Sequence, residues 1–596
     1  MKEKKFIVGI DLGTTNCVLS YIDVDEIKEG EAPPIRVMEV LQLVSPKQID
    51  SLKLLPSFIY LPTKAEKDSN ALTTPWDPFA DRVIGKYARE RGAEVPSRLI
   101  SSAKSWLCHP AIDRNAPILP IDAPSDCTKL SPIAAQASLL RHLKASWNQT
   151  IGKEEGAPLE KQEIYLTIPA SFDAVARDLT VKAARAAGLE NITLLEEPQA
   201  AFYAWLFRQG DAWRDEVKAG DLILVCDIGG GTTDFSLIKV DEKAGELSLE
   251  RILVGDHLLL GGDNMDLALA HEIARALPKK LDRLQMQSLW HSARIAKEKL
   301  LDSDEINEVP VVITGRGSGL IGGTIRTSLK REQLNSVILD GFFPICKRDE
   351  MPISSTSVGL KELGLPYAQD SAISRHLAAF LMKAKKDTPY TPSLVLFNGG
   401  VMKARLLRKR VVELLSNWAE GEGGSKIKSL SAPELDLAVA QGACFYGVTR
   451  KIGGIRIRGG LGRSYYIGLE GTRPAIPGVP PDIKALCIVN QGIEEGQSVE
   501  LPDRVFGLVV GKQVEFKFMG SSTRRDDKPG DVIEDWEEDI QEITTVTASI
   551  DAPGLPSGTI IPVMLQAKVT EVGTLALSLV SVEGNIKFDL EFNVRG

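Results

Sequence analysis

Two stretches of this chain repeat one pattern, and the repeat constrains the fold more than any other feature. Residues 6–24 read FIVGIDLGTTNCVLSYIDV, and residues 222–240 read LILVCDIGGGTTDFSLIKV. In each stretch an apolar run ends at an aspartate, Asp11 or Asp227, passes through glycines and threonines, and resumes as a second apolar run. The pattern predicts a strand, a tight glycine turn and a returning strand in both places. Two such copies indicate one supersecondary unit used twice, with the copies facing each other.

The glycine turns of both copies suit an anion. Glycine allows backbone N–H groups to approach a ligand closely, and threonine hydroxyls add donors. Phosphate is the obvious anion, and an aspartate beside it makes sense as the holder of a hydrated Mg²⁺. Either turn alone could equally be an ordinary glycine hairpin. The pair predicts a clamp that grips a triphosphate from both sides.

Length and composition set the broad class. The chain has 596 residues, enough for several folding units, and its 43% hydrophobic and 25% charged residues are typical of a soluble globular protein. The net charge of -9 argues against general nucleic-acid binding. Neither a signal peptide nor an apolar run of membrane-spanning length is evident. The seven cysteines are scattered without metal-ligand spacing, which favours reduced thiols and a cytoplasmic location.

Two charged residues stand where catalysis at a phosphate would need them. Lys104 lies between apolar neighbours in ISSAKSWL, and Glu197 stands at a strand-to-helix junction in ITLLEEPQAAFYAW. A lysine in such a place is usually a solvated or snorkelling side chain, and a carboxylate at such a junction can be a helix cap. The alternatives are a lysine that reaches the γ-phosphate and a carboxylate that orients the attacking water.

Hydrophobic spacing predicts further elements. Helices are predicted over residues 131–147, 173–187 and 281–301, and the polar residues 45–53 are predicted to form a loop. Residues 395–415 predict a buried strand, an Asn-Gly-Gly turn and a basic helix, whose glycines suit close approach to a ligand.

The pattern changes after residue 446. Residues 450–463, RKIGGIRIRGGLGR, are dense in glycine and arginine and contain no good helix, so we place a linker there. From residue 465 onward the apolar residues have a period of two, which predicts an antiparallel β-sandwich. The expected division is an ATPase domain over residues 1–450, a linker over 451–463 and a β-sandwich over 464–596.

With the motifs GIDLGTTN, EEP, DIGGGTTD and NGG in this order, the chain resembles the 70-kDa heat-shock chaperone family of ATPases over nearly its whole length. The paired hairpins belong to the wider superfamily of actin, sugar kinases and chaperone ATPases. The resemblance implies an actin-like, two-lobed α/β ATPase domain of duplicated ribonuclease-H-like subdomains, followed by an all-β peptide-binding sandwich. The chain looks like a divergent, bacterial-type member. The helical lid that follows the sandwich in the family is not expected in this sequence, either because it is absent by nature or because the chain was cut.

The resemblance implies roles for the residues at matching positions. Asp11 and Asp227 would organise the Mg²⁺ shell through water, and Asp234 would assist there. The implied catalytic residues are Lys104, Glu197, Thr232, Asp11, Asp227 and Asp234. The implied phosphate-binding residues are Gly13, Thr14, Thr15, Gly229, Gly230, Gly231 and Thr232, and those bordering the nucleoside are Gly262, Lys297, Gly399, Gly400 and Asp436. Pro169 and Arg177, in IPASFDAVAR, match the family's proline switch and the arginine that senses it.

The chain departs from the family at the nucleoside end. On the helix predicted over residues 281–301, only Lys297 matches the adenosine clamp; Arg294 and Glu298 flank it on a face that also fits a solvated surface. Other replacements are Leu301 and Val401 where serines are usual and Lys403 where an arginine is usual. The linker also lacks the family's short acidic-leucine segment. These changes predict altered base contacts and altered coupling between the domains.

The leading hypothesis from the sequence is an ATP-dependent chaperone that binds and releases unfolded or extended polypeptide. Its cofactors would be ATP or ADP and Mg²⁺, with K⁺ as a further candidate, and a J-domain co-chaperone and a nucleotide exchange factor would be its partners. A weakly hydrolysing or non-hydrolysing holdase or exchange factor is the alternative; the altered clamp favours it, and the retention of Lys104, Glu197 and Thr232 opposes it. A small-molecule kinase of the superfamily would have no use for the C-terminal sandwich.

Overall fold

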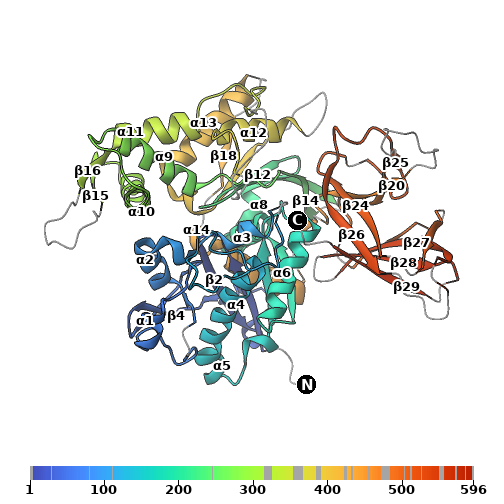
Figure 1. Ribbon diagram of the computed structural model, residues 1–596. Helices are drawn as coiled ribbons and strands as arrows, with labels where there is room; N and C mark the ends of the chain where they lie inside the picture. Colours follow the sequence, from blue (N-terminus) through green and yellow to red (C-terminus); the bar gives the residue numbers. More distant parts are fainter. Residues whose placement is uncertain are drawn as a thin grey trace, which may run out of the picture.

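Mixed α/β structure forms the N-terminal part of the chain, and antiparallel strands form the C-terminal part, as predicted (Figure 1). The computed structural model describes residues 5–592 apart from 29, 79–80, 110–111, 244–245, 314–324, 354–366, 384–390, 422–425, 431–433, 454–456, 459, 471–482, 495, 502–503, 511–512, 525, 550–555, 557, 571–573 and 584–585. Among the described residues no helix is long and apolar enough to cross a membrane.

The first predicted hairpin lies at the centre of a sheet, and we call the part of the chain around it the first lobe. This sheet has the order β11, β10, β1, β2, β3, formed by Ile192–Glu196, Glu163–Ile168, Phe6–Leu12, Asn16–Asp23 and Arg36–Val37. β1 is parallel to β10 and antiparallel to β2. The buried apolar residues of β1 explain its central place, because a strand covered on both faces reads as an almost continuous hydrophobic run.

The second predicted hairpin lies at the centre of a second sheet with the same topology, which defines the second lobe. The sheet has the order β18, β17, β12, β13, β14, β19, formed by Lys428–Ser429, Leu394–Asn398, Leu222–Ile228, Thr233–Lys243, Glu246–Val254 and Ile457–Arg458. β12 is parallel to β17 and antiparallel to β13. The strand order and directions around the two hairpins match, which confirms the predicted duplication.

Two helices hold the lobes together. α7 (Glu197–Gln209) crosses α14 (Leu435–Ile452) so closely that a Cβ atom on Gly442 would lie 1.7 Å from the carbonyl oxygen of Ala200. α14 also packs against β1 of the first lobe. Because the backbones themselves are in contact, the glycine turns of the two hairpins face one another across a defined gap.

The remaining predicted helices are present. They are α4 (Pro132–Gln149), α6 (Ala174–Ala186), α10 (Arg283–Asp302) and, after the Asn-Gly-Gly turn, α13 (Arg405–Glu420). Two more helices matter for the site, the short α3 (Ala103–Trp106) and the longer α9 (Gly262–Arg275). Further helices in the two lobes are α1 (Lys64–Asp68), α2 (Lys86–Glu94), α5 (Ile151–Glu154), α8 (Trp213–Glu216), α11 (Arg331–Asn335) and α12 (Ile373–Met382).

The loop predicted over residues 45–53 is wrong. β4 (Val40–Ser45) and β5 (Gln48–Leu52) form an antiparallel hairpin there. The first three residues of β5 are exposed and the last two only half-buried, so the strand carries no hydrophobic alternation that a sequence pattern could reveal.

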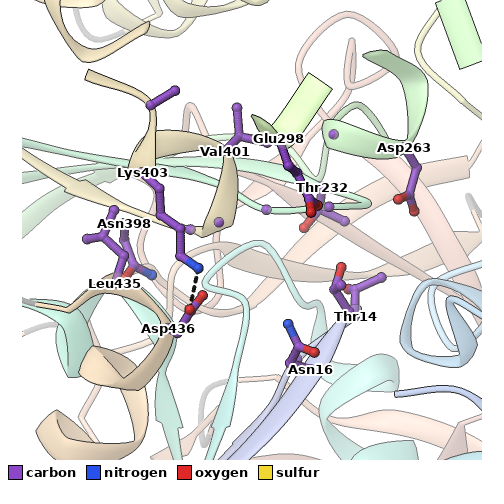
Figure 2. A pocket seen from close by; sticks show the side chains of 18 of the residues that line it. Thr14, Asn16, Thr232, Asp263, Glu298, Asn398, Val401, Lys403, Leu435 and Asp436 are labelled. Carbon is purple, nitrogen blue, oxygen red and sulfur yellow. Dashed lines mark hydrogen bonds and ion pairs between the residues drawn. The ribbon is translucent and has the colours of Figure 1, made fainter. Parts of the chain in front are cut away.

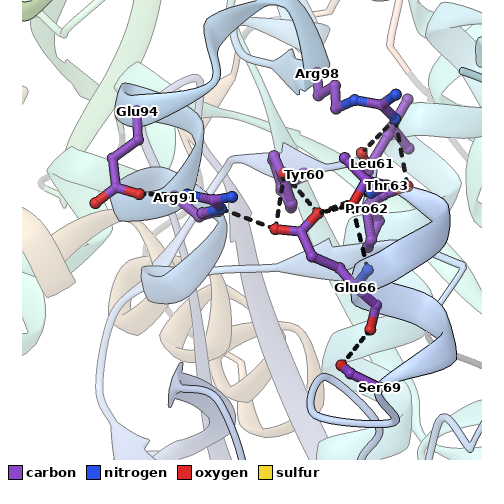
Figure 3. Close-up of polar contacts among 9 residues, drawn as sticks. All are labelled: Tyr60, Leu61, Pro62, Thr63, Glu66, Ser69, Arg91, Glu94 and Arg98. Atoms are coloured by element: carbon purple, nitrogen blue, oxygen red, sulfur yellow. Dashed lines mark hydrogen bonds and ion pairs between the residues drawn. The ribbon is translucent and has the colours of Figure 1, made fainter. Parts of the chain in front are cut away.

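Beyond the first sheet, a polar cluster fixes the small helices α1 and α2 (Figure 3). Thr63 caps α1 by accepting a hydrogen bond from the backbone N–H of Glu66. The Glu66 carboxylate in turn accepts hydrogen bonds from the Tyr60 hydroxyl at 2.9 Å and from Nε of Arg91, on α2, at 2.9 Å. One carboxylate thereby joins a strand and two helices, which keeps this corner of the first lobe rigid although its helices are short.

The C-terminal part is built of antiparallel strands. One group consists of β20 (Ser464–Glu470), β21 (Ile483–Val489), β24 (Gln513–Ser521), β25 (Val532–Ile533) and β26 (Gln541–Ser549), and the other of β22 (Ser498–Glu500), β23 (Phe506–Val509), β27 (Ile560–Val569), β28 (Leu575–Ser581) and β29 (Lys587–Phe592). Phe518 and Val546 from the first group share a core with Val563 and Leu577 from the second. The period-two pattern therefore predicted the antiparallel strands correctly. β26 also pairs with β29, so hydrogen bonds join the two groups into one ten-stranded sheet.

The expectation that residues 450–463 contain no helix is wrong at their beginning, because α14 continues to Ile452. Ile457 and Arg458 then form β19, which adds in parallel to the edge of β14. Residues 454–456 and 459 lie outside the described part. The dense glycines gave no local pattern from which these short elements could be predicted. β19 in particular is ordered by pairing with β14. The domain boundaries stay predictions.

Candidate functional site

A cleft of about 630 Å³ lies between the two hairpins, large enough for a small organic ligand. Figure 2 shows Thr14, from the first hairpin, and Thr232, from the second, at the same space. The cleft brings together most of the residues predicted from the sequence: Asp11, Gly13, Thr14, Thr15, Lys104, Glu197, Asp227, Gly229, Gly230, Thr232, Gly262, Lys297, Gly399, Gly400 and Asp436. Of the remaining predicted residues, Gly231, Asp234, Pro169 and Arg177 are not part of its lining.

The two glycine turns approach each other closely. A Cβ atom on Gly230 would lie 2.1 Å from the hydroxyl oxygen of Thr15, and one on Gly231 would lie 2.8 Å from the methyl group of Thr14. Both contacts cross from one hairpin to the other, so larger residues would force the hairpins apart. The N–H of Gly229 closes its own turn by donating to the carbonyl of Thr232 at 2.9 Å. Such a narrow, glycine-lined gap is the shape that backbone donors need to surround a phosphate.

Asp11 and Asp227 end the first strand of each hairpin and face the same cleft. Asp11 accepts a hydrogen bond of 3.3 Å from the Thr167 hydroxyl, and Asp227 accepts one of 2.6 Å from the Asn398 amide. Burial, and then the nearby Glu197 carboxylate, raise the pKa of Asp11 to about 7 and the pKa of Asp227 well above its usual range. Buried carboxylates that repel one another in this way are stabilised by a cation.

The donor set fits a hydrated Mg²⁺ better than a metal held by protein alone. Among the described residues there is no group of three or more His, Cys, Asp or Glu side chains able to hold a metal ion. Mg²⁺ usually keeps several waters and takes one or two carboxylates together with phosphate oxygens. The arrangement therefore suits a metal that arrives with a nucleotide.

Lys104 and Glu197 form a buried ion pair at the floor of the cleft. Lys104 belongs to α3 and its side chain is only 6% exposed, which rules out the solvated lysine that the sequence left open. Glu197 is the first residue of α7, and its carboxylate contacts Lys104. Burial alone would lower the pKa of Lys104, but the carboxylates of Glu197 and Asp11 outweigh burial and raise it, so the lysine is positively charged.

Asp234 lies behind the cleft with two partners that no sequence signal identified. The Ser171 hydroxyl donates a hydrogen bond to Asp234, and Nδ1 of His257 lies 2.8 Å from the same hydroxyl oxygen. Burial favours the neutral imidazole, but the Cys108 thiol and Asp234 outweigh it and raise the pKa of His257 to about 10. Ser171 and His257 stand in irregular segments, where no periodicity or motif marks a site residue.

The end of the cleft at α10, predicted to border the nucleoside, differs from a simple solvated helix face. On α10, Arg294 pairs with Glu298 at 3.1 Å, as the i,i+4 spacing suggests. Lys297 instead is buried and pairs with Asp266, on α9, at 2.6 Å. Across the cleft Lys403 pairs with Asp436, the contact drawn in Figure 2. These three cations, Arg294, Lys297 and Lys403, are therefore engaged by carboxylates of the protein itself.

The predicted switch residues belong to a second buried network. Nη2 of Arg177, on α6, donates to Glu196 at 2.5 Å, and the other oxygen of Glu196 pairs with Arg251, on β14. Arg251 also donates a hydrogen bond of 2.8 Å to the carbonyl of Gly460, just before β20. Glu196 directly precedes Glu197. Of these neighbouring carboxylates, Glu197 lines the cleft, and Glu196 is connected through Arg251 to the predicted linker. The sequence indicated Arg177 but neither Glu196 nor Arg251. Pro169 follows β10 and is buried, beside the chain reversal closed by Phe172.

The β-strand region packs against the same segment of the first lobe. Val175 and Leu179, on α6, form one apolar cluster with Ile543 on β26 and Phe592 on β29. Figure 1 shows α6 beside these strands. A movement of α6 in the first lobe would therefore displace the side chains of the β-strand region that pack against it.

A comparison with protein families gives one match. The family model described as Hsp70 protein matches residues 78–355, somewhat less than half of the chain. The matched region includes Lys104, Glu197, the second hairpin and α10, and it stops short of the first hairpin and the Asn-Gly-Gly turn.

Proposed function

The chain belongs to the Hsp70 family, and on this basis we propose that it hydrolyses ATP and uses the nucleotide state to control the binding of unfolded or extended polypeptide. The observation that carries the proposal is the buried Lys104–Glu197 pair at the floor of a cleft lined by two glycine hairpins. Lys104 is nearly fully buried and Glu197 is 14% exposed at the cleft, so the pair stands where a phosphate held by the hairpins would be attacked by water.

The two hairpins would hold the phosphates of ATP between them. Gly229, Gly230 and Gly231 would offer backbone N–H groups from one side, and Thr14 and Thr15 would offer donors from the other. Asp11 and Asp227 would hold Mg²⁺ through water, and the metal would supply charge neutralisation for the phosphates. The fit rests on the narrow glycine gap and on two carboxylates whose pKa values are raised by burial and then by the nearby Glu197 carboxylate.

Hydrolysis would need a positioned water and compensation for developing negative charge. Glu197 contacts Lys104 and lines the cleft, so its carboxylate is placed to orient a water beside the terminal phosphate. The ammonium group of Lys104 would offset the charge that develops on the phosphoryl oxygens. Thr232 would add a hydroxyl from the second hairpin, and Asp234 would assist from behind it.

The C-terminal strands are the proposed polypeptide-binding part. Antiparallel sheets can offer backbone hydrogen bonds to an extended chain at an edge and apolar contacts from alternate residues. The buried route from Glu197 through Glu196 and Arg251 to the carbonyl of Gly460 supports communication between this part and the nucleotide cleft. A J-domain co-chaperone and a nucleotide exchange factor are further proposed partners.

One observation favours the alternative of a weakly hydrolysing holdase or exchange factor. Lys297 is held by Asp266 and Lys403 by Asp436, so neither cation is free to contact a nucleobase without losing its carboxylate. Nucleotide affinity would then depend mainly on the phosphates. The ion pairs of Lys297 and Lys403 affect the affinity for the nucleotide, whereas the Lys104–Glu197 pair affects the hydrolysis step. Hydrolysis is therefore the better-supported proposal.

Steady-state ATP hydrolysis of the full chain, with and without an unfolded polypeptide, distinguishes the candidates. Stimulation by the polypeptide supports a coupled chaperone. Slow hydrolysis that ignores the polypeptide supports the holdase alternative. No hydrolysis above that of a Lys104→Ala and Glu197→Ala double variant contradicts the enzymatic proposal, and phosphate transfer to a metabolite would indicate a kinase.

A further inference from the structure

Three buried side chains meet behind the second hairpin, outside the lining of the cleft. They are Asp234 on β13, Ser171 in the segment after β10, and His257 in the segment after β14. Ser171 and Asp234 are 4% and 5% exposed, and the His257 side chain is 13% exposed. The residues come from both lobes, so the contact forms only when the lobes are packed together.

The hydrogen-bond directions in this cluster follow from its chemistry. A serine hydroxyl carries one proton, and Ser171 donates it to Oδ1 of Asp234. The hydroxyl oxygen must then accept from Nδ1 of His257, which lies 2.8 Å away. Nδ1 is itself 3.7 Å from Oδ1 of Asp234. The ring of Phe172 packs edge-on against His257, with the ring centroids 5.7 Å apart, and limits its rotation. The His257 imidazole therefore fixes the orientation of the Ser171 hydroxyl, and this hydroxyl fixes the orientation of the Asp234 carboxylate.

Asp234 needs this support because of its register. In the β12–β13 pair it stands directly opposite Asp227, and like charges across an antiparallel pair repel each other. Ser171 holds Oδ1 of Asp234 and so restricts the rotation of this carboxylate. A carboxylate with one oxygen held and its rotation restricted is better suited to orient a water than a free one.

We propose that Ser171 and His257 are positioning residues for Asp234, and that they hold this carboxylate in the orientation required by the attacking water in ATP hydrolysis. The inference rests on the proposed function. Neither residue touches the reacting atoms, so both act through Asp234. Their removal should slow the chemical step and leave nucleotide affinity nearly unchanged.

The test is single-turnover hydrolysis of Mg·ATP by the full chain, with the dissociation constant of the nucleotide measured in parallel. Ser171→Ala should lower the single-turnover rate by about 10²-fold, as expected for a misplaced catalytic group, and change the dissociation constant by less than about twofold. Ser171→Thr keeps a hydroxyl and should recover most of the rate. His257→Phe keeps an aromatic ring beside Phe172 but lacks Nδ1, and should also slow the step.

The matched control is Ser236→Ala. Ser236 is on the same strand, two residues after Asp234, and is fully buried, but its hydroxyl has no hydrogen-bond partner in the described part of the chain. This variant should hydrolyse ATP like the wild type. In the Ser171→Ala/His257→Phe double variant the loss should be close to that of Ser171→Ala alone, because both residues act through one carboxylate.

The outcomes separate this inference from the proposed function. If the wild type hydrolyses ATP and Ser171→Ala is as fast as Ser236→Ala, the positioning role is wrong and the proposed function stands. If Ser171→Thr is as slow as Ser171→Ala, the hydroxyl is not what matters and the positioning role is also wrong. A wild-type chain without ATP hydrolysis would overturn the proposed function, and this inference with it.

Discussion

The two hairpins share a pattern and a place in their sheets, yet they surround their aspartates differently. In the first hairpin the register sets Asp11 opposite Val18, so its carboxylate has no charged neighbour across the strand pair. In the second, Asp227 stands opposite Asp234. The hydrogen-bond donors from the adjacent parallel strands also differ. Asp11 accepts from the Thr167 hydroxyl at 3.3 Å, and Asp227 accepts from the Asn398 amide at 2.6 Å. One fold unit therefore provides one carboxylate in the first lobe and two in the second.

This difference indicates a division of labour between duplicated units. A single carboxylate suffices to hold a hydrated cation, whereas two adjacent carboxylates can hold the cation and orient a water at once. We expect the first hairpin to contribute mainly to binding and the second to contribute to binding and chemistry. The following variants test that expectation.

The largest expected effect is at Asp227. Asp227→Asn should lower ATP turnover by about 10³-fold, and Asp11→Asn by about 10²-fold, because only the first variant disturbs the carboxylate pair of the second hairpin. Turnover at saturating Mg²⁺ and ATP measures the ratio between the variants. Equal losses in the two variants would contradict the division of labour.

Next in size is the loss of the charged pair on the floor of the cleft. Lys104→Ala or Glu197→Ala should lower hydrolysis by about 10²-fold and leave ATP binding largely intact, because a positioned catalytic group is lost while the hairpins remain. Hydrolysis and nucleotide affinity are measured on the same preparations. Lys182→Ala, which removes an exposed partner of Asp178 on α6, is the control and should behave like the wild type. Wild-type turnover in either active-site variant would contradict the assignment.

Acid should remove the contribution that a buried histidine of the first lobe makes to stability. His142, on α4, contacts the carbonyl of Leu41 at 2.8 Å, and burial lowers its pKa to about 4. The unfolded chain takes up this proton near pH 6.5 and the folded chain only near pH 4, so stability falls as the pH drops through this window. Between pH 7 and pH 5 the expected loss from His142 alone is about 2 kcal/mol, measured as the difference between the wild type and a variant that does not titrate there.

The pH prediction has a control in each lobe. His142→Gln keeps a donor for Leu41 without titrating, so its unfolding free energy should fall less between pH 7 and pH 5. His257, in the second lobe, has a pKa raised to about 10, so the folded chain holds this proton throughout the window and the contribution of His257 to stability rises as the pH drops. Denaturant unfolding at both pH values checks the difference, and an equal loss in wild type and His142→Gln would contradict it.

The smallest expected effect comes from widening the gap between the hairpins. Gly230→Ala brings a Cβ atom to within 2.1 Å of the Thr15 hydroxyl oxygen, so the hairpins must separate. Nucleotide affinity should fall about tenfold, since one or two phosphate contacts weaken. Gly341→Ala, whose Cβ atom would meet nothing closer than 4.0 Å, should bind as tightly as the wild type. Titration with a nucleotide checks both variants.

Much of the fold was predictable because it repeats local patterns. The two hairpins, the long helices α4, α6 and α10 and the alternating strands after residue 464 all carry a hydrophobic period of their own. The elements that were missed, β5 and β19, lack such a period. β5 is a largely polar strand paired with β4, and β19 is two residues long and depends on β14.

The candidate site was predictable where a motif marked it. Asp11, Asp227, Lys104 and Glu197 were all named from the sequence, and the structure places them around one cleft. The contacts of Lys297 with Asp266 and of Lys403 with Asp436 were not predictable, since each joins elements distant in the sequence. The roles assigned to all these site residues in catalysis and nucleotide binding stay predictions.

The sequence by itself determined the duplicated hairpins, their aspartates and the β-strand region, because strand, turn and alternation are encoded within a few neighbouring residues. Only the tertiary structure decided which side chain faces which. Strand register set Asp234 against Asp227, and the packing of the two lobes brought Ser171 and His257 to it. Such contacts depend on where whole elements come to rest, which no local pattern specifies. Hence the paired hairpins can be predicted from the sequence, whereas the contacts of Ser171 and His257 behind the second hairpin appear only in the fold.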